Sequence, residues 1–540
     1  MSENAVDRFG FFDSLCTVGR HLKLQAGGLH TAEQLLEDMD RCGVAEALVL
    51  DSLSRENHPV EGNPRILDVC AAHPRLNPAW AAIPHAPSDE QPRGEALVES
   101  MRQSDVRALF VFARQYRVPL ADWAVDDFFA PLAAARVPVF LNYNEVGPVA
   151  QGWDQTDWPE LVNFCRRHPQ LPVIWTEWRI RRQNRALYRA LDACPNLHIE
   201  ISGCWLHHHI EYVTRTFGAH RLIFGSNWPR YGQEATLTTL TCADIDDGNK
   251  RRIAGDNLRE LLSWNEPVAA ADVELPAPAD EYAAFARSGR RPARMTFLDN
   301  HGHMGGYSFH YHLPNASADD CVADMDRLGV QKTCIFSFSG ASCDEHYGND
   351  LVIDAVQRYP DRFIGFTLLN PHRGEKWMLE ELRRCAEGGL RGVKLIAHYQ
   401  GYPEEGPMID VPCQWAHEHG QIILNHNWGL PAQVERLVTT YPDACFFTGH
   451  TTTAYADIMK RHANLYVCSC PLISPRACRH LVSVIGADRL LFGSDMSDLP
   501  ITWGLGPILL ADLPVEDKRK ILGGNLEQIL ARYSRKSDPS

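Results

Sequence analysis

The chain has 540 residues, 45% of them hydrophobic and 22% charged, which is typical of a folded globular protein and excludes a disordered or fibrous chain. Its 68 acidic and 53 basic residues give a formal charge of −15, which argues against nucleic acid or an anionic membrane as a partner. No apolar run approaches the roughly 18 residues of a membrane span, and the first residues lack an export-signal pattern, so we predict a soluble cytoplasmic protein.

Sixteen cysteines are scattered along the chain without a C-x-x-C pair. This spacing argues against a zinc ribbon or a thioredoxin-like motif. We interpret most of them as small buried hydrophobic residues of a protein in a reducing compartment. The close set Cys468, Cys470 and Cys478 is the alternative candidate for redox activity.

The sequence contains the same unit twice. Asp38-Met-Asp-Arg-Cys-Gly-Val recurs as Asp324-Met-Asp-Arg-Leu-Gly-Val, and three further segments recur in the same order. We therefore predict two domains with an Ala- and Pro-rich linker between them, which contains one short helix near residues 282–287. The predicted boundaries are 1–265 for the first domain, 266–294 for the linker and 295–540 for the second domain.

Each unit alternates short apolar runs with amphipathic stretches. In the second unit we expect strands at 295–300, 333–338, 363–369, 392–397, 422–426, 445–449, 465–469 and 490–493, and helices that include 318–328, 375–387, 411–418 and 430–441. Eight strands that alternate with helices predict an α/β fold of two tandem (β/α)8 TIM barrels. An open doubly wound sheet is the alternative, but no G-x-G-x-x-G follows the first strand.

Metal-ligating residue types stand at the predicted strand ends of the second barrel. His301 and His303 end the first strand, and alternate residues of a strand point the same way, so both imidazoles can reach one metal ion. Singly, each residue has a structural explanation, such as a helix N-cap for an aspartate, but a common placement favours a site. The ends of the fourth, fifth, sixth and eighth strands carry Lys394, His426, His450 and Asp495.

These motifs resemble the amidohydrolase superfamily, in particular the group with aminocarboxymuconate semialdehyde decarboxylase, resorcylate decarboxylase and dicarboxylate lactonases. The resemblance covers residues 295–533 and rests on Asp299-Asn-His301-Gly-His303, Gly392-Val-Lys394-Leu, Leu424-Asn-His426, Thr448-Gly-His450 and Leu491-Phe-Gly-Ser-Asp495. It implies one divalent metal, zinc first with iron or manganese as alternatives, and catalytic roles for His450 and Asp495. The implied ligands are His301, His303, His426 and Asp495, with Lys394 and His450 added if the site is binuclear.

The first barrel departs from this pattern at every position. The places of the metal-binding residues hold Leu15, Thr17, Phe110, Tyr143 and Asn227, and His450 faces Glu177 or Trp178, depending on a one-residue choice of alignment. These side chains offer a divalent ion little, so we predict that the first barrel is metal-free and has lost catalysis. We expect it to form an intramolecular pseudo-dimer with the second barrel, and pairing of whole chains stays open.

Two polar clusters in the first barrel need an interpretation. The run His207-His-His209 precedes a helix, and we predict a solvated patch rather than a set of metal ligands. Arg179, Arg181 and Arg182 follow the sixth strand. A solvated charged face is our first interpretation for them, and contact with an anionic substrate of the second barrel is the alternative.

We therefore expect a metal-dependent hydrolase that acts on an amide, lactone or other ester bond of a small molecule. Nonoxidative decarboxylation with the same ligands is the alternative reaction, and a non-catalytic binding scaffold is the alternative class. Histidines and tyrosines in the loops after the first and fourth strands could stack on a planar substrate or simply pack the barrel mouth. They are His310, His312, His398, Tyr399 and Tyr402.

Overall fold

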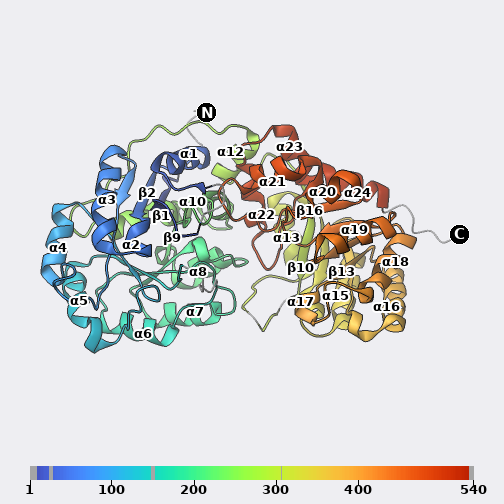
Figure 1. Ribbon diagram of the computed structural model, residues 1–540, viewed down its shortest axis with the longest axis horizontal. Coiled ribbons are helices and arrows are strands. Elements are labelled where there is room, and N and C mark those ends of the chain that lie inside the picture. Colours follow the sequence, from blue (N-terminus) through green and yellow to red (C-terminus); the bar gives the residue numbers. More distant parts are fainter. Residues whose placement is uncertain (1–8, 24–27, 147–152, 306, 310, 534–540) are drawn as a thin grey trace. The chain divides into compact units, whose positions relative to one another are not determined.

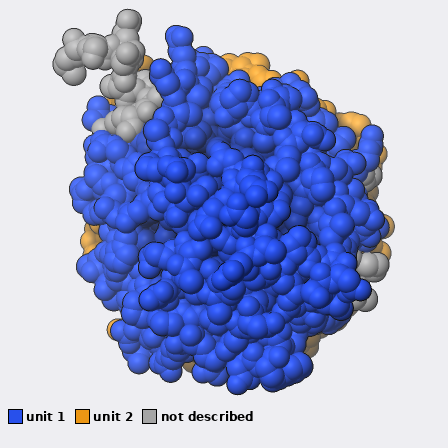
Figure 2. Space-filling view, turned by 90° about the vertical axis from the view of Figure 1, so that its left-hand side faces the viewer, with its two compact units in different colours: residues 1–290, 310–312, 473–475 blue, residues 291–309, 313–472, 476–540 orange. Residues whose placement is uncertain are grey.

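The computed structural model describes residues 9–23, 28–146, 153–305, 307–309 and 311–533. The chain divides into two compact units (Figure 2). Unit 1 comprises residues 1–290 with the short segments 310–312 and 473–475. Unit 2 comprises residues 291–309, 313–472 and 476–540. Residues 266–290 thus belong to unit 1, and Thr241 Oγ1 donates a hydrogen bond to the Ala286 carbonyl oxygen of this segment at 2.6 Å.

Unit 2 is a closed parallel barrel. Its eight strands pair in chain order. The first and last strands meet, because Asn300 N donates to Phe492 O and Asp495 N donates to His301 O, both at 2.9 Å. All eight strands predicted from the sequence are present. They are β10 (Phe297–Met304), β11 (Val330–Ser337), β12 (Phe363–Leu368), β13 (Gly392–Leu395), β14 (Ile422–Asn425), β15 (Cys445–Thr448), β16 (Leu465–Cys468) and β17 (Leu490–Leu491).

Helices surround this barrel (Figure 1). The predicted helices 318–328 and 375–387 are confirmed with identical bounds. The first begins at a capping box between Ser317 and Asp320 and ends at Gly329, whose φ of 81° suits glycine. The helices are α13 (Ala318–Leu328), α14 (Phe338–Ser342), α15 (Glu345–Arg358), α16 (Glu375–Glu387), α17 (Ala397–Gln400), α18 (Asp410–Glu418), α19 (Pro431–Thr440), α20 (Ala456–Arg461), α21 (Ala477–Ile485), α22 (Ile501–Leu509), α23 (Val515–Arg519) and α24 (Asn525–Tyr533).

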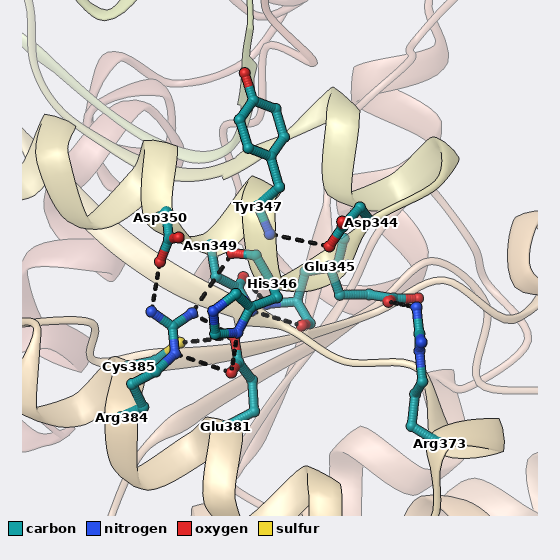
Figure 3. Close-up of polar contacts among 11 residues, drawn as sticks. Asp344, Glu345, His346, Tyr347, Asn349, Asp350, Arg373, Glu381, Arg384 and Cys385 are labelled. Atoms are coloured by element: carbon teal, nitrogen blue, oxygen red, sulfur yellow. Dashed lines mark hydrogen bonds and ion pairs between the residues drawn. The ribbon is translucent and has the colours of Figure 1, made fainter.

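A buried carboxylate joins α15 to α16 (Figure 3). Glu381 of α16 is only 4% exposed. It accepts hydrogen bonds from His346 Nδ1 at 2.9 Å, Asn349 Nδ2 at 2.8 Å and Arg384 Nε at 3.0 Å. Asn349 also bonds both the N–H and the carbonyl of Leu368. The network therefore ties two outer helices to the end of strand β12.

Unit 1 repeats the barrel with one interruption. Its third strand is split into β3 and β4 after Pro78, which has no N–H to donate to a ladder. First and last strands meet again, because Thr17 N donates to Trp228 O at 2.8 Å. The strands are β1 (Phe12–Val18), β2 (Glu46–Asp51), β3 (Leu76–Pro78), β4 (Trp80–Ala81), β5 (Leu109–Phe112), β6 (Val139–Asn142), β7 (Val173–Thr176), β8 (Leu197–Glu200) and β9 (Leu222–Ile223).

The helices of unit 1 cover its strands in the same way (Figure 1). No described helix in either unit has the length and apolar character needed to cross a bilayer. The helices are α1 (Ala32–Cys42), α2 (Ser52–Glu56), α3 (Pro59–Ala72), α4 (Gly94–Gln103), α5 (Asp122–Ala135), α6 (Trp158–Arg167), α7 (Asn184–Ala193), α8 (His209–Phe217), α9 (Gln233–Thr241), α10 (Asp247–Arg251), α11 (Asn257–Leu262) and α12 (Glu281–Ser288).

Candidate metal centre

Two imidazoles meet one carboxylate at the carboxyl end of the unit 2 barrel. His301 Nε2 lies 3.6 Å and His303 Nδ1 lies 3.3 Å from the same Oδ1 of Asp495. The three residues are between 1% and 8% exposed. Neither ring nitrogen makes a hydrogen bond. Buried polar atoms are normally satisfied, so the arrangement calls for a partner that accepts two nitrogen lone pairs.

A second buried carboxylate fixes the backbone beneath this set. Asp299 accepts hydrogen bonds from His301 N at 3.0 Å, Ser494 N at 2.9 Å and Ser494 Oγ at 2.6 Å. Burial raises the pKa of Asp299 to about 7. Asp495 adopts a φ of 59°, in the left-handed region that aspartate and asparagine tolerate best among residues with a side chain. The tie between the first and last strands therefore holds the histidines and Asp495 in one frame.

Hydrogen bonds to carbonyl groups define which ring nitrogens carry lone pairs. A carbonyl only accepts, so His301 Nδ1, which is 2.8 Å from Gly449 O, carries the hydrogen and Nε2 keeps its lone pair. His450 Nδ1 donates to Cys470 O at 3.2 Å in the same way. His450 Nε2 must then accept from His426 Nδ1, 3.2 Å away. This leaves a lone pair on His426 Nε2.

Burial keeps the histidines of the site neutral. It lowers the pKa of His301, His303 and His450, and nearby Lys394 lowers them further. Lys394 is fully buried, its Nζ makes no hydrogen bond, and it lies 4.3 Å from the centre of the Phe336 ring. Burial lowers the pKa of Lys394 to about 7. Neutral imidazoles with one carboxylate fit a divalent cation.

The structure brings together most of the residues predicted from the sequence. Ligand atoms of His301, His303 and Asp495 lie within 4.8 Å of one another, and His450 and Cys470 form a second such set with Asp495. His426, the fourth predicted ligand, is hydrogen-bonded to His450. Lys394 is close enough for its charge to lower the pKa of His301, His303 and His450.

A cleft of about 440 Å³ opens beside these histidines. Of the loop residues proposed from the sequence, only His398 lines it. Tyr402 is buried and accepts a hydrogen bond from Ile396 N, and His310 lies outside the described residues. No motif in the sequence singles out most of the lining, although Trp428 follows His426 by two residues. The lining residues are His398, Glu404, His426, Asn427, Trp428, Thr448, His450, Thr451, Thr452 and Tyr455.

A family model described as amidohydrolase matches residues 43–264 and 301–531, which is most of the chain and part of each unit. The chain belongs to the amidohydrolase family. Members of this superfamily use divalent metals, in agreement with the site of unit 2. No curated protein matches this amidohydrolase in sequence.

Solved structures match a part of this amidohydrolase that is about as long as one unit. An uncharacterised TIM-barrel protein from Bordetella bronchiseptica is 17% identical, with a TM-score of 0.38, over 45% of this chain and 100% of its own. A 5-carboxyvanillate decarboxylase from Novosphingobium aromaticivorans, complexed with manganese, and a 4-oxalomesaconate hydratase from Rhodopseudomonas palustris are each 17% identical, with TM-scores of 0.36. Both cover 44% of this chain and 97% of their own. At these identities we draw no conclusion about activity.

Strand pairing in the amidohydrolase also resolves the alignment choice at His450. Asn142 pairs with Thr176 in unit 1, and Asn425 pairs with Thr448 in unit 2. Two residues beyond the threonine, unit 1 has Trp178 where unit 2 has His450. The last strand of unit 1 is followed by Asn227 in place of Asp495, with almost the same φ of 61°.

Two predictions for unit 1 of the amidohydrolase were wrong. His207 and His209 do not form a solvated patch, because they are 4% and 2% exposed. His209 Nδ1 is 3.1 Å from Tyr188 Oη, and burial lowers the pKa of His209 to about 3. Arg179 is not part of a solvated face either, since it is 8% exposed, whereas Arg182 is exposed as expected.

The close cysteine set behaves as the sequence indicated. Cys468, Cys470 and Cys478 are all buried, and no disulfide is present among the described cysteines. Burial raises the pKa of Cys468 and of Cys470, which keeps both as thiols. They act here as small packing residues.

Proposed function

We propose that unit 2 hydrolyses an amide, lactone or other ester bond of a small molecule with the help of one divalent metal ion, zinc first. The observation that carries the proposal is the pair of unpaired nitrogens, His301 Nε2 and His303 Nδ1, that face one oxygen of Asp495 in a buried site. The free lone pair of His426 would complete a four-ligand set. Three imidazoles and a carboxylate are typical zinc ligands.

A divalent ion at this position supplies Lewis acidity, which polarises a substrate carbonyl and lowers the pKa of water. The residues around it manage protons. Asp495 has a second carboxylate oxygen with which to accept a proton from the attacking water and pass it to the leaving group. The tie from Asp299 to Ser494 and His301 keeps this carboxylate in place before substrate arrives.

His450 is proposed as a proton acceptor. Its Nδ1–H is committed to the Cys470 carbonyl, so Nε2 is the nitrogen that can take up a proton, in exchange for the hydrogen bond that it accepts from His426 Nδ1. Burial lowers the pKa of His450, which keeps it neutral and able to accept a proton near neutral pH. Stabilisation of an oxyanion by Nε2 would need the protonated ring, so that role would begin only after proton transfer.

The lining of the cleft favours hydrolysis of an uncharged bond over decarboxylation. No arginine or lysine is among the described residues that line it, whereas Glu404 is. A substrate carboxylate would therefore meet no positive side chain along the cleft walls, although ion pairing is the usual means of binding such a group. Esters, lactones and amides carry no charge that needs neutralising.

The test uses the full chain after metal analysis and addition of zinc or manganese. A panel of lactones, aryl esters and N-acyl amides is compared with aryl carboxylates, in water enriched in heavy oxygen. We expect heavy oxygen in the product acid and no carbon dioxide. Release of carbon dioxide without oxygen incorporation would replace the proposal with a decarboxylase. A folded chain that binds no metal would support the alternative of a non-catalytic binding scaffold.

A matched variant separates chemistry from folding. His450→Gln keeps a polar side chain but removes the proposed proton acceptor, so we expect metal content to stay near one equivalent while kcat falls by about 100-fold or more. Equal losses of metal and activity would instead make His450 a ligand. The control is His346→Gln, which lies in the network of Figure 3 and not in the cleft.

A further inference from the structure

The carboxyl end of the unit 1 barrel carries two arginines. Arg55 stands on α2, directly after β2, and is 7% exposed. Arg230 follows β9 by the same number of residues as Asp498 follows β17, so an arginine replaces an aspartate next to the position of the metal centre. Arg55, on a helix, and Arg230, in a turn, both follow strands at the barrel end where Asn227 replaces Asp495.

The two guanidinium groups flank one indole ring. Arg230 Cζ lies 3.3 Å and Arg55 Cζ lies 5.7 Å from the centre of the Trp178 ring. Burial lowers the pKa of Arg55, the charge of Glu56 opposes this effect, and the charge of Arg230 adds to the lowering. The two like charges repel each other, and the burial of Arg55 strengthens this repulsion.

Neither arginine has a described carboxylate as an ion-pair partner. Arg55 Nη2 donates only to neutral groups, Asn142 Oδ1 at 3.2 Å and the Asn144 carbonyl at 3.0 Å. Glu56, the acidic neighbour of Arg55 along the chain, accepts instead from His21 Nδ1 and Leu22 N at 2.6 and 2.7 Å. The side chain of Arg230 interacts with the hydroxyl of Tyr231.

Five buried N–H donors at this barrel end have no acceptor. Arg55 and Arg230 each leave Nε–H unpaired. Native proteins satisfy nearly all buried donors, and a group of orphaned donors is what an anion requires. The donors are Arg55 Nε, Arg230 Nε, Trp178 Nε1, Asn144 Nδ2 and Asn227 Nδ2.

We propose that unit 1 binds a small oxyanion, a carboxylate or a phosphate, between Arg55 and Arg230 beside Trp178. A guanidinium presents parallel N–H groups that match two oxygens of either anion. The anion would balance the two positive charges and supply acceptors to the orphaned donors. Unit 1 would thus be a ligand-binding barrel. Its anion site would lie at the barrel end that is equivalent to the end with the metal centre in unit 2.

Titration calorimetry of the full chain with sodium benzoate and with inorganic phosphate, in buffer free of other oxyanions, tests the site. We expect saturable binding of at least one of them, and the one that binds identifies the class of ligand. Arg230→Gln and Arg55→Gln should each weaken binding by about tenfold or more, because each removes a charged hydrogen-bonding partner. Arg215→Gln, an exposed arginine of α8 with the same change in charge, should leave it unchanged.

Two outcomes overturn the proposal. The first is that neither anion binds the wild-type chain, and the second is that Arg230→Gln binds as tightly as wild type. Arg230 is the decisive position because it is partly exposed, so its variant should fold even if loss of the buried Arg55 disturbs unit 1. An anion held by the metal of unit 2 would be unaffected by Arg230→Gln and so would give the second outcome.

Discussion

The carboxyl ends of the two barrels present opposite chemistry on a shared backbone plan. In unit 2 the unpaired nitrogens of His301 and His303 face one carboxylate, and the lone pair on His301 Nε2 suits a cation. In unit 1 the unpaired nitrogens of Arg55 and Arg230 carry hydrogens, which suit an anion. The strands, their pairing and the closing contacts are alike. The barrel therefore determines where a site lies, whereas a few side chains determine whether it suits a cation or an anion.

The largest expected effect tests the cation half of this contrast. His301→Ala with His303→Ala should lower bound metal from one equivalent to almost none and abolish activity, because two of the proposed ligands are removed. Elemental analysis of the purified chain measures it. Thr17→Ala, at the unit 1 position that matches His303, serves as the control and should keep the metal. Retention of a full equivalent in the double variant would refute the site.

Exchange of the residues at the eighth strand end is the next test. Asp495→Asn gives unit 2 the residue of unit 1 and should weaken metal binding by more than the roughly 10–100-fold that loss of an outer hydrogen-bonding partner costs. The reverse change, Asn227→Asp, should bring no metal into unit 1, since Leu15 and Thr17 offer no imidazole. Titration with zinc in the presence of a competing chelator measures metal binding by both variants. A gain of metal by Asn227→Asp would break the comparison.

A third test addresses what the units share. Asp13 accepts from Ser226 N at 2.9 Å and Leu15 N at 3.2 Å, as Asp299 does from Ser494 and His301. Asp13→Ala and Asp299→Ala should each destabilise their own unit by about 2–4 kcal/mol, because buried N–H groups lose their acceptor. Hydrogen exchange in β1 and β10 measures it. Only Asp299→Ala should also weaken metal binding. Equal losses of metal in the two variants would contradict the placement of the metal site in unit 2.

The smallest effect concerns a polar contact of unit 2. Helix α16 buries Glu381, whereas α4 of unit 1 buries only Leu97, Val98 and Met101. Burial opposes ionisation of Glu381, but hydrogen bonds from Arg384, Asn349 and His346 lower its pKa to about 2, from 4.5. Because the pKa of Glu381 is lower in the folded than in the unfolded state, its ionised form stabilises the fold above pH 4.5. This stabilisation is lost as the pH falls through 2.

The change that tests it is Glu381→Gln. The variant should have a lower free energy of unfolding than the wild type near neutral pH. This difference should shrink between about pH 4.5 and 2, as measured by urea unfolding at several pH values. Met101→Leu in α4 is the control and should show no such pH dependence. A constant deficit across this range would show that packing, rather than charge, explains the role of Glu381.

Much of the fold and part of the site could be predicted from the sequence, because local rules govern them. The alternation of apolar runs located all eight strands of unit 2, and Ser317 and Gly329 mark the ends of α13 through capping. The His-x-His pattern on β10 places two ligands by strand geometry alone. The structure confirms that these rules bring His301 and His303 to Asp495.

The remainder depends on tertiary packing that no local pattern encodes. The sequence could not show that His209 is buried against Tyr188 or that Arg179 lies between two tryptophan rings. The cleft takes Glu404 and Tyr455 from separate loops, whose approach depends on the whole barrel. The unpaired donors of unit 1 were invisible for the same reason, since satisfaction of a hydrogen bond is a property of neighbours in space.

The Asp299 carboxylate has a consequence for how unit 2 would acquire and lose the proposed ion. It joins the first strand to the last through Ser494 and His301, and needs no metal to do so. Folding and binding of the proposed ion would therefore be separate events, unlike those of a zinc finger, which folds only around its ion. Chelators should strip the barrel while leaving it intact, and the emptied protein should regain activity on refilling, with whichever divalent ion its surroundings provide.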